Sequence, residues 1–355
     1  MDLAEFDYHL PPERIAQQPL ADRAASRMLV LHRREQRWED RLFRDLRAYL
    51  GPGDCLVLND SKVFPSRLFG HRTGVRAVPI GKNNPKRHEY LSGQVEVFLL
   101  RPQSDDARTW TALVRPGRKL RSGERIRFDG GVEAEILEHR EFGERLVRFE
   151  VEGDLYAWLD TAGHTPLPPY IDRPDTAQDR DRYQTVYAKQ AGSAAAPTAG
   201  LHFTPEVLEA CRGAGSDIAC VTLHVGLGTF QPLHTEIVEK VELHAESYRI
   251  TEENAAKLRA ARRLVCVGTT SVRTIETAAR GAGFSASSGD TSLYIYPGFA
   301  YRAVGAMLTN FHLPKSSLIL LVAAFAGREF TLAAYRHAVA AEYRFYSYGD
   351  CMLIV

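Results

Sequence analysis

The sequence predicts a large α/β domain, a mixed sheet flanked by helices, with an inserted small antiparallel β-barrel domain. Its 355 residues suit two domains, since one domain usually has about 100 to 200 residues. Apolar strands and amphipathic helices alternate after residue 154, whereas residues 66–153 hold short β-rich runs between Gly, Pro and charged turns. We therefore expect residues 1–65 and 154–355 to form the large catalytic domain, and residues 66–153 the barrel.

The N-terminal part predicts strands of the sheet with a helix between them. Residues 27–33 (RMLVLHR) form an apolar run typical of a strand. Asp40 is the expected N-cap of a helix that ends at Gly51. The run CLVLN at 55–59 follows at once and predicts a buried strand.

The segment 66–153 contains the runs VEVFLL, WTALV, ERIRF, VEAEILE and ERLVRFEV, whose spacing is typical of a small barrel. It also contains two basic clusters. Residues 115–127 carry six Lys and Arg against one acid, and residues 71–92 carry five against one. Charge runs usually only face solvent, but two of them in one small domain favour contact with a phosphate backbone.

The second half predicts the alternating elements. Thr204 is an N-cap, and Pro205 opens a helix that stops at Gly213. In chain order we then expect a strand at 217–225, a helix at 253–263, a strand at 264–268, a helix at 271–280, strands at 292–296 and 304–309, and helices at 316–327 and 331–343. The longest apolar run has ten residues, about half of the roughly 20 that span a bilayer, so we expect a buried helix.

The composition excludes several classes of protein. Hydrophobic residues make up 45% and charged residues 25%, which is typical of a globular protein and not of a disordered, collagenous or coiled-coil one. The net charge is +1, so affinity for nucleic acid would have to come from local patches. Five cysteines without a CxxC pair, and an N-terminus without a signal pattern, predict a cytoplasmic protein.

One strand-to-helix turn has the character of an anion site. An apolar strand ends at Gly268, and three hydroxyl residues then lead into a helix: Thr269, Thr270 and Ser271. Backbone N–H groups and the helix dipole would hold a carboxylate or phosphate there, and Arg273 would add a bidentate donor. Capping of the helix by Ser271 or Thr270 is the alternative. GxGxxG and GxxxxGK[ST] are both missing, so ordinary dinucleotide and NTPase functions lose their main support.

The run AAPTAGLHFT at 195–204 is a loop of small residues. Pro197 and Thr198 leave the backbone accessible, Gly200 permits close approach of a ligand, and His202 stands just before a helix. Such a histidine serves either as a structural hydrogen bonder or in proton transfer.

Two further segments place histidines beside glycines or acids. The run VTLHVGLGTFQPL carries His224 and then Gly226 and Gly228. His244 and Glu246 alternate with apolar residues, so on a strand both would face the same side. Such a pair moves protons or binds zinc, but the PCxxC of zinc deaminases is missing, and we expect no metal. A solvated strand face with an ion-paired histidine is the alternative.

The C-terminal region adds polar residues at another strand end. Asn310 and His312 follow an apolar strand, and sites in open α/β sheets gather at such ends. The run YRFYSYGD supplies Tyr346, Tyr348 and Asp350. Aromatics at this density are typical of a core, but they also offer stacking and cation–π faces to a base or a sulfonium.

With these motifs the chain resembles the S-adenosylmethionine:tRNA ribosyltransferase-isomerases of the queuosine pathway. The matching segments run in order over nearly the whole chain and include AAPTAGLHFT, VTLHVGLGTFQPL, VGTTSVRTIE, LTNFHLP and YRFYSYGD. The resemblance implies transfer and isomerisation of the ribosyl moiety of S-adenosylmethionine onto 7-aminomethyl-7-deazaguanine at the wobble position of tRNA. Epoxyqueuosine-tRNA, adenine and methionine would be the products. S-adenosylmethionine would be a consumed substrate, so no cofactor is expected.

The resemblance and the residue types suggest roles. Proton transfer is assigned, without an order, to His202, His224, His244 and Glu246. S-adenosylmethionine is assigned to Pro197, Thr198, Gly200, Gly226, Gly228, Thr269, Thr270, Ser271 and Arg273. The tRNA base or anticodon is assigned to Asp60, Arg67, Asn310, His312, Tyr346, Tyr348 and Asp350. We expect a monomer whose partners are S-adenosylmethionine and tRNA, with no membrane.

Departures from the family pattern qualify these roles. Family members commonly show two asparagines at the positions of Asn59 and Asp60, which puts a role of residue 60 as an amide donor in doubt. Residues 71–92 resemble an insertion whose basic content suggests extended tRNA contact. The rival functions are a zinc-dependent nucleoside deaminase or hydrolase that uses His244 and Glu246, and a non-catalytic RNA-binding module.

Overall fold

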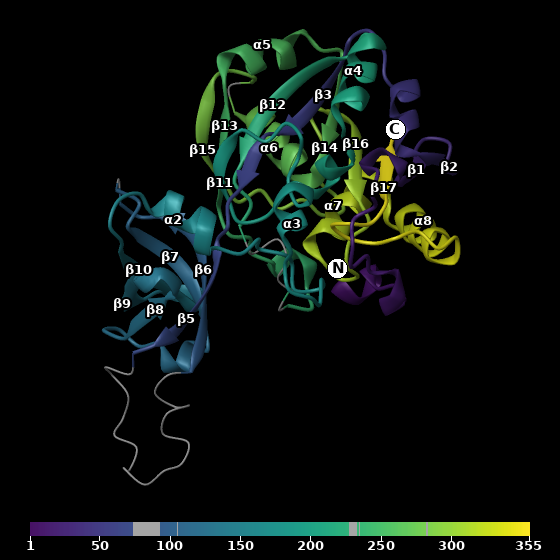
Figure 1. The fold of residues 1–355 in the computed structure, drawn as a ribbon. Coiled ribbons are helices and arrows are strands. Elements are labelled where there is room, and N and C mark those ends of the chain that lie inside the picture. Colours follow the sequence, from purple (N-terminus) through teal and green to yellow (C-terminus); the bar gives the residue numbers. More distant parts are fainter. Residues whose placement is uncertain (74–92, 105, 227–232, 234, 282) are drawn as a thin grey trace. The chain divides into compact units, whose positions relative to one another are not determined.

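In the computed structural model of the chain, the structure describes residues 1–73, 93–104, 106–226, 233, 235–281 and 283–355 (Figure 1). The described chain forms two compact units. The large unit comprises residues 1–62 and 167–355, and the barrel unit comprises residues 63–166. A mixed sheet with helices in the first and a closed antiparallel barrel in the second confirm the predicted fold class.

The large unit is built on a nine-stranded sheet with the order β15-β13-β12-β3-β14-β16-β17-β1-β2. Its strands are β1 (Arg27–His32), β2 (Arg37–Leu42), β3 (Asp54–Asn59), β12 (Asp217–Leu223), β13 (Glu246–Ile250), β14 (Arg263–Val267), β15 (Ser287–Thr291), β16 (Val304–Asn310) and β17 (Cys351–Ile354). The four neighbours β12, β3, β14 and β16 run parallel. Their carboxyl ends therefore meet at one edge of the sheet, where ligand sites of such sheets lie. A separate two-stranded sheet joins β4 (Ser61–Val63) and β11 (Gln190–Ser193).

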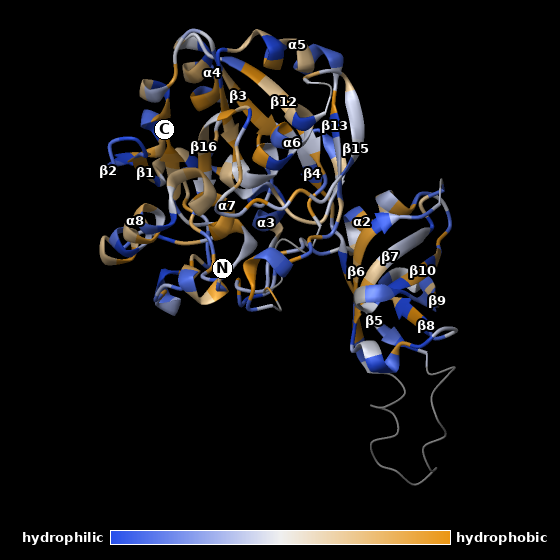
Figure 2. Ribbon diagram, turned by 180° about the vertical axis from the view of Figure 1, so that it is seen from behind, coloured by the Kyte–Doolittle hydropathy of each residue, from blue (hydrophilic) through white to orange (hydrophobic). Residues whose placement is uncertain are grey.

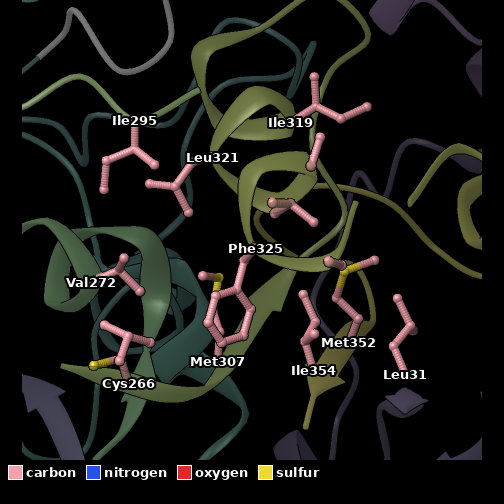
Figure 3. Packing of buried hydrophobic residues seen from close by; sticks show 14 of the residues in the cluster. Leu31, Cys266, Val272, Ile295, Met307, Ile319, Leu321, Phe325, Met352 and Ile354 are labelled. Atoms are coloured by element: carbon pink, nitrogen blue, oxygen red, sulfur yellow. The ribbon is translucent and has the colours of Figure 1, made fainter. Parts of the chain in front are cut away.

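Helices cover both faces of this sheet. They are α4 (Pro205–Gly213), α5 (Glu252–Ala260), α6 (Gly268–Arg280), α7 (Ser317–Ala326) and α8 (Arg328–Ala340), and the large unit also contains the short helix α3 (Ala177–Arg182). Alternate residues of β3 enter opposite cores, because side chains of a strand point to alternate faces. Val57 packs with Val272, Leu321 and other residues of α6 and α7, in the core of which Figure 3 shows a part, whereas Leu56 and Leu58 pack with Phe203 and α4.

The barrel unit closes in the order β10-β7-β6-β5-β8-β9. Its strands are β5 (Arg67–Arg72), β6 (Gln94–Pro102), β7 (Thr109–Arg115), β8 (Arg125–Phe128), β9 (Glu133–His139) and β10 (Glu144–Glu150). Helix α2 (Leu155–Ala162) buries Leu155 and Leu159 in the same core as Trp110. The unit thus extends beyond residue 153, because the helix that follows the last strand completes its core.

Short 3-10 helices connect these elements: η1 (Leu3–Phe6), η2 (Pro12–Arg14), η3 (Arg23–Ala25), η4 (Phe43–Tyr49), η5 (Gly117–Lys119), η6 (Asp129–Gly131), η7 (Glu141–Gly143), η8 (Thr198–His202) and η10 (Val238–Lys240). Figure 2 shows the apolar residues concentrated in the central strands of the large sheet, with polar residues on the outer helices and loops.

Two predicted elements are wrong. Asp40 caps no helix but lies in β2, and its carboxylate accepts a hydrogen bond of 2.6 Å from the hydroxyl of Tyr343. The predicted strand at 292–296 is displaced to β15, whose sequence SSGDT is polar. β15 is an edge strand that pairs with β13 through its backbone, so hydropathy did not mark it.

Within the described part of the chain, no single helix is long and apolar enough to cross a membrane. Only α7 and α8 taken together meet the length and hydropathy required, and they are bent by 115° at their junction.

Candidate active site

A pocket opens where two of the parallel strands of the large unit end. β14 ends directly before Gly268 and β16 ends at Asn310, and both strand ends line the pocket together with residues 196–199. The space between its wall atoms is about 660 Å³, part of which is open solvent. The predicted site residues in its wall are Pro197, Thr198, Thr269, Thr270, Asn310, His312 and Tyr346.

The first turn of α6 lines this pocket with backbone amides. Val267 is the N-cap and makes no side-chain capping bond, so neither Thr270 nor Ser271 caps the helix. The amides of this first turn, which include those of Thr269 and Thr270, have no acceptor within the helix itself, as in the first turn of any α-helix, and no side chain caps them. Gly268 has φ +83°, a conformation that glycine adopts freely, and this lets the strand enter the helix at once. The turn therefore suits a carboxylate or phosphate.

Asn59 ties the ends of β3, β12 and α6 together, although the sequence pattern did not mark it as a site residue. Its amide nitrogen donates to the carbonyl of Leu223 (3.0 Å) and to Oγ1 of Thr270 (3.3 Å). Its Oδ1 accepts from the N–H of Leu223 (3.0 Å). Asn59 is fully buried. The available signal was an amide residue at the end of an otherwise apolar strand.

The loop of small residues contributes only its first part to the pocket. Pro197, Thr198 and Ala199 line it, with η8 beginning at Thr198. Gly200 is buried elsewhere, and a side chain there would collide with the hydroxyl of Tyr187. Glycine is therefore required by packing against Tyr187, and the predicted close approach of a ligand to Gly200 is not needed to explain it.

His202 lies behind the pocket wall and is fully engaged in hydrogen bonds. Its Nδ1 is 2.8 Å from Oγ of Ser26, and its Nε2 is 3.2 Å from Oδ1 of Asn310. Because Oδ1 of Asn310 only accepts, Nε2 of His202 is the protonated nitrogen. Burial lowers the pKa of His202 to about 4. A neutral imidazole with both nitrogens bonded positions Asn310 and is a weak base.

The Asn310 side chain connects His202 to an aromatic part of the pocket wall. Its Nδ2 donates to the carbonyl of Tyr346 (2.8 Å), a residue held at φ +69°. Few residues other than glycine adopt a positive φ without support from their surroundings. The Tyr346 ring lies 4.6 Å from that of Tyr170, and both rings line the pocket. His202 thus acts on the pocket through Asn310 and Tyr346.

Of the other C-terminal residues predicted to bind tRNA, Tyr348 and Asp350 form hydrogen bonds within the protein, whereas His312 lines the pocket. His312 lines the pocket, its Nε2 lies 2.8 Å from Oγ1 of Thr309, and burial lowers its pKa to about 3. The hydroxyl of Tyr348 donates to Asp179 (2.8 Å). The carboxylate of Asp350 accepts from the amides of Arg27 and Arg344, both at 2.8 Å.

We expect mild acid to destabilise the large unit through His202 and His312. Their folded pKa values of about 4 and about 3 lie below the ordinary value of about 6.5. As the pH falls below about 6.5, the unfolded chain binds protons that the folded chain does not, so the free energy of unfolding falls. Denaturant unfolding between about pH 7 and 4.5 should show a shallower fall in His202→Gln, with exposed His9→Gln as control. Equal slopes in wild type and His202→Gln would contradict this.

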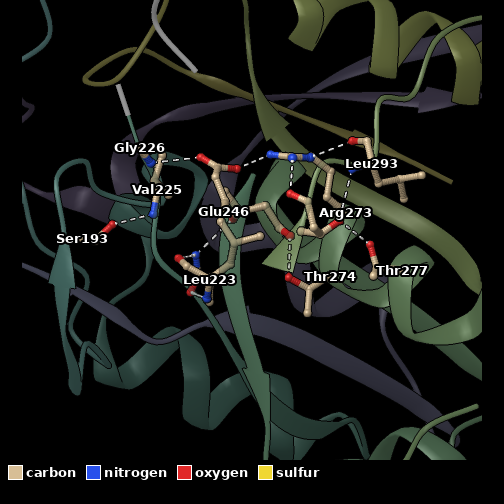
Figure 4. A network of polar contacts seen from close by, with 12 residues as sticks. Ser193, Leu223, Val225, Gly226, Glu246, Arg273, Thr274, Thr277 and Leu293 are labelled. Atoms are coloured by element: carbon tan, nitrogen blue, oxygen red, sulfur yellow. Dashed lines mark hydrogen bonds and ion pairs between the residues drawn. The ribbon is translucent and has the colours of Figure 1, made fainter. Parts of the chain in front are cut away.

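Glu246 and Arg273 form a buried ion pair (Figure 4). The other guanidinium nitrogens of Arg273 donate to the carbonyls of Leu293 (3.0 Å) and Thr291 (3.3 Å). The carboxylate of Glu246 also accepts from the N–H of Gly226 (2.9 Å). Arg273 is not among the residues that line the pocket. The bidentate donor predicted for S-adenosylmethionine is therefore committed to holding β13 and β15 against α6.

His244 and Glu246 do not share a strand face. β13 begins at Glu246, which is buried, whereas His244 precedes the strand and is exposed. The prediction that the two side chains face the same side is therefore wrong. It requires both residues to lie in the strand, but the strand starts two residues after His244.

His224 and Asp60 follow neighbouring parallel strands. His224 comes directly after β12 and Asp60 directly after β3. Burial lowers the pKa of His224, and the charge of Asp60 partly opposes this shift. Burial raises the pKa of Asp60, whose Oδ1 accepts from the hydroxyl of Thr222 (2.7 Å). Nδ1 of His224 is buried without a hydrogen-bond partner among the described residues. Neither His224 nor Asp60 is among the residues that line the pocket, although the next residue, Val225, is. Of the histidines nominated for proton transfer, His224 is the one with a buried ring nitrogen that lacks a hydrogen-bond partner among the described residues.

Two further predicted site residues are Gly228 and Arg67. Gly228 falls outside the described residues, as does most of the basic insertion 71–92. Arg67 belongs to the barrel unit, where it pairs with Glu96 at 2.9 Å.

Comparison with known proteins decides the family. The family model for the queuosine biosynthesis protein matches residues 3–354. The chain belongs to the queuosine biosynthesis protein family. A relative from Solibacter usitatus named S-adenosylmethionine:tRNA ribosyltransferase-isomerase is 69% identical over the whole of both chains. One from Heliobacterium modesticaldum with the same name is 46% identical, again over the whole of both chains.

A solved structure agrees with this family assignment. The crystal structure of an S-adenosylmethionine tRNA ribosyltransferase from Thermotoga maritima covers 99% of this chain and 100% of that chain, with 38% identity and a TM-score of 0.54. The resemblance inferred from the sequence motifs is thus confirmed. Within the described part of this family member, no three His, Cys, Asp or Glu side chains come together as a metal site.

Proposed function

We propose that this chain transfers and isomerises the ribosyl moiety of S-adenosylmethionine onto 7-aminomethyl-7-deazaguanine at the wobble position of tRNA. The observation that carries the proposal is full-length identity of 69% to a relative named for this activity. The pocket at the carboxyl edge of the sheet supports it. S-adenosylmethionine is consumed and releases adenine and methionine, and we propose a cytoplasmic monomer without cofactor or metal.

The pocket suits the two ends of S-adenosylmethionine. The backbone amides at the start of α6, whose residues Gly268, Thr269 and Thr270 line the pocket, would hold the methionine carboxylate without Arg273. Tyr170 and Tyr346 offer ring faces on the same pocket. A stacked adenine or the sulfonium cation gains from such faces. A helix start for an anion and aromatic rings in the wall of one pocket support a ligand with a carboxylate, a sulfonium and a base.

His224 is our candidate for the proton acceptor. The sulfonium acidifies the adjacent ribose C–H, and a neutral imidazole takes this proton; adenine then leaves with a proton supplied to it. The tRNA amine also loses a proton before it attacks the sugar. His202 and His312 are weak bases by their pKa values of about 4 and about 3, and Glu246 is held by Arg273. His202 is therefore a positioning residue in this proposal.

The deciding experiment follows adenine release. Purified protein is incubated with labelled S-adenosylmethionine and tRNA that carries the aminomethyl base, and adenine and methionine are quantified. We expect both in equal amounts, and only with the modified tRNA. Adenine release without tRNA, or loss of activity after chelation, would contradict the proposal and favour a metal-dependent hydrolase.

A further inference from the structure

Three arginines of the barrel unit carry unneutralised charge on its surface. Arg115, Arg118 and Arg121 are exposed and form no ion pair among the described residues. Among the other exposed arginines of the barrel, Arg127 pairs with Glu133 at 2.7 Å and Arg148 pairs with Glu135 at 2.8 Å, whereas Arg108 forms no ion pair among the described residues. Three unpaired arginines therefore gather in one segment, residues 115–121, around η5, and Arg108 is the single one outside it among these.

A buried arginine fixes this segment from within. Arg145 is only 8% exposed, and its guanidinium donates to the carbonyls of Gly117 (3.3 Å) and Leu120 (3.4 Å). It also donates to the carbonyls of Gly143 (3.0 Å) and Glu144 (2.9 Å) and forms no ion pair in the described part of the chain. The buried cation is therefore compensated by carbonyl dipoles, which include those of the segment.

A second buried arginine acts in the same way. Nη1 of Arg72 donates to the carbonyl of Lys119 at 3.3 Å, and Arg72 is 8% exposed. Three carbonyls of the segment are thus held by guanidinium groups of the barrel. These bonds hold the backbone of the segment and occupy three of its carbonyls inside the unit. The exposed side chains of the segment include the three unpaired arginines, and the buried guanidinium groups of Arg72 and Arg145 add positive charge on its inner side.

The number of unpaired arginines favours an extended anion over a small one. They stand at every third residue across the segment, and three guanidinium groups together can bind more than one phosphate. Arginine binds phosphate through two parallel N–H groups, and a fixed backbone lowers the entropy cost of binding. A polyanionic backbone therefore fits this surface.

We infer that residues 115–121 of the barrel form a docking surface for the phosphate backbone of RNA. The inference rests on the proposed function for the identity of the RNA, a tRNA, and adds where on the protein its backbone is held. It divides the basic run at 115–127 into a binding part, Arg115 to Arg121, and a part that is neutralised within the barrel, Arg125 and Arg127.

The test compares two double variants of the full chain with equal net charge. Arg118→Gln with Arg121→Gln removes two unpaired arginines, and Arg127→Gln with Arg148→Gln removes two that are ion-paired. Binding of an unmodified tRNA transcript is measured by fluorescence anisotropy over a series of salt concentrations. The slope of log Kd against log salt should fall by about 1 for each phosphate that an arginine no longer binds, so by about 2 in the first variant and little in the second.

The outcomes separate the surface from the activity. Equal slopes in the two variants would mean that only net charge matters and would overturn the inference, as would slopes unchanged from wild type in both. Thermal unfolding of both variants checks that each is folded. Failure of wild type to release adenine with modified tRNA would overturn the proposed function instead, whatever the slopes show.

Discussion

His224→Gln is expected to lower turnover by about 10²- to 10⁴-fold, the usual contribution of a general base. Burial lowers the pKa of His224, so its imidazole is neutral near pH 7 and its buried Nδ1, free of partners among the described residues, is able to take a proton. Glutamine keeps a similar size but has no basic nitrogen. Adenine release under single-turnover conditions measures the step, and calorimetric titration with S-adenosylmethionine checks that binding changes by no more than a few fold.

A control histidine and a neighbouring carboxylate make this result specific. His337 lies on α8 and bonds to Asp40 at 3.1 Å, so His337→Gln should keep wild-type turnover. Asp60→Asn should move the acid limb of the pH–rate profile to lower pH, because the charge of Asp60 raises the pKa of His224. Full turnover in His224→Gln, or a loss matched by weaker S-adenosylmethionine binding, would remove His224 from the role of base.

The edge of the sheet at which the pocket lies could be predicted from the sequence, because it depends on topology. Gly268 and Asn310 follow apolar runs that form β14 and β16, and the carboxyl ends of parallel neighbours lie side by side. Any polar residues at those ends meet in space whatever their distance in the chain. Residues as far apart in sequence as Thr198 and Tyr346 therefore line one pocket.

The hydrogen-bond and ion-pair partners of individual side chains could not be predicted from the sequence in this way. The sequence placed Arg273 near the start of α6 but gave no sign that Glu246, from a strand with weak apolar character, would take up its guanidinium. It placed His202 just before a helix but not beside Ser26 and Asn310. Hydrogen bonds of this kind join segments that lie far apart in the sequence. The residue type therefore predicts which bonds a side chain is able to form, but only the fold determines which partner it has.

The same reasoning applies to charge. Counting residues at 115–127 gives one basic cluster, but Arg125 and Arg127 both pair with Glu133 of β9. That carboxylate comes from the paired neighbouring strand, so its effect depends on barrel register. A surface potential therefore follows from strand pairing as much as from composition.

Arg273→Met is expected to lower the free energy of unfolding by about 3 to 5 kcal/mol, because it leaves the carboxylate of Glu246 buried without its cation. The two side chains are only 8% and 7% exposed, so water compensates little. Denaturant unfolding with the midpoint and slope both fitted measures this effect. If Arg273 instead bound the substrate carboxylate, Arg273→Met would keep the stability of wild type and lose only S-adenosylmethionine affinity, and the structural role would be refuted.

The double variant Arg273→Met with Glu246→Gln decides how the pair acts. It removes both charges, and the amide oxygen of glutamine still accepts from the N–H of Gly226, as Glu246 does at 2.9 Å. Since replacing both members of a buried pair is much milder than removing one, the double variant should be more stable than Arg273→Met alone. Recovered stability with recovered adenine release would place the pair in the support of β13 and β15. Recovered stability without adenine release would instead give Glu246 a part in the chemistry that its bond to Arg273 alone does not explain.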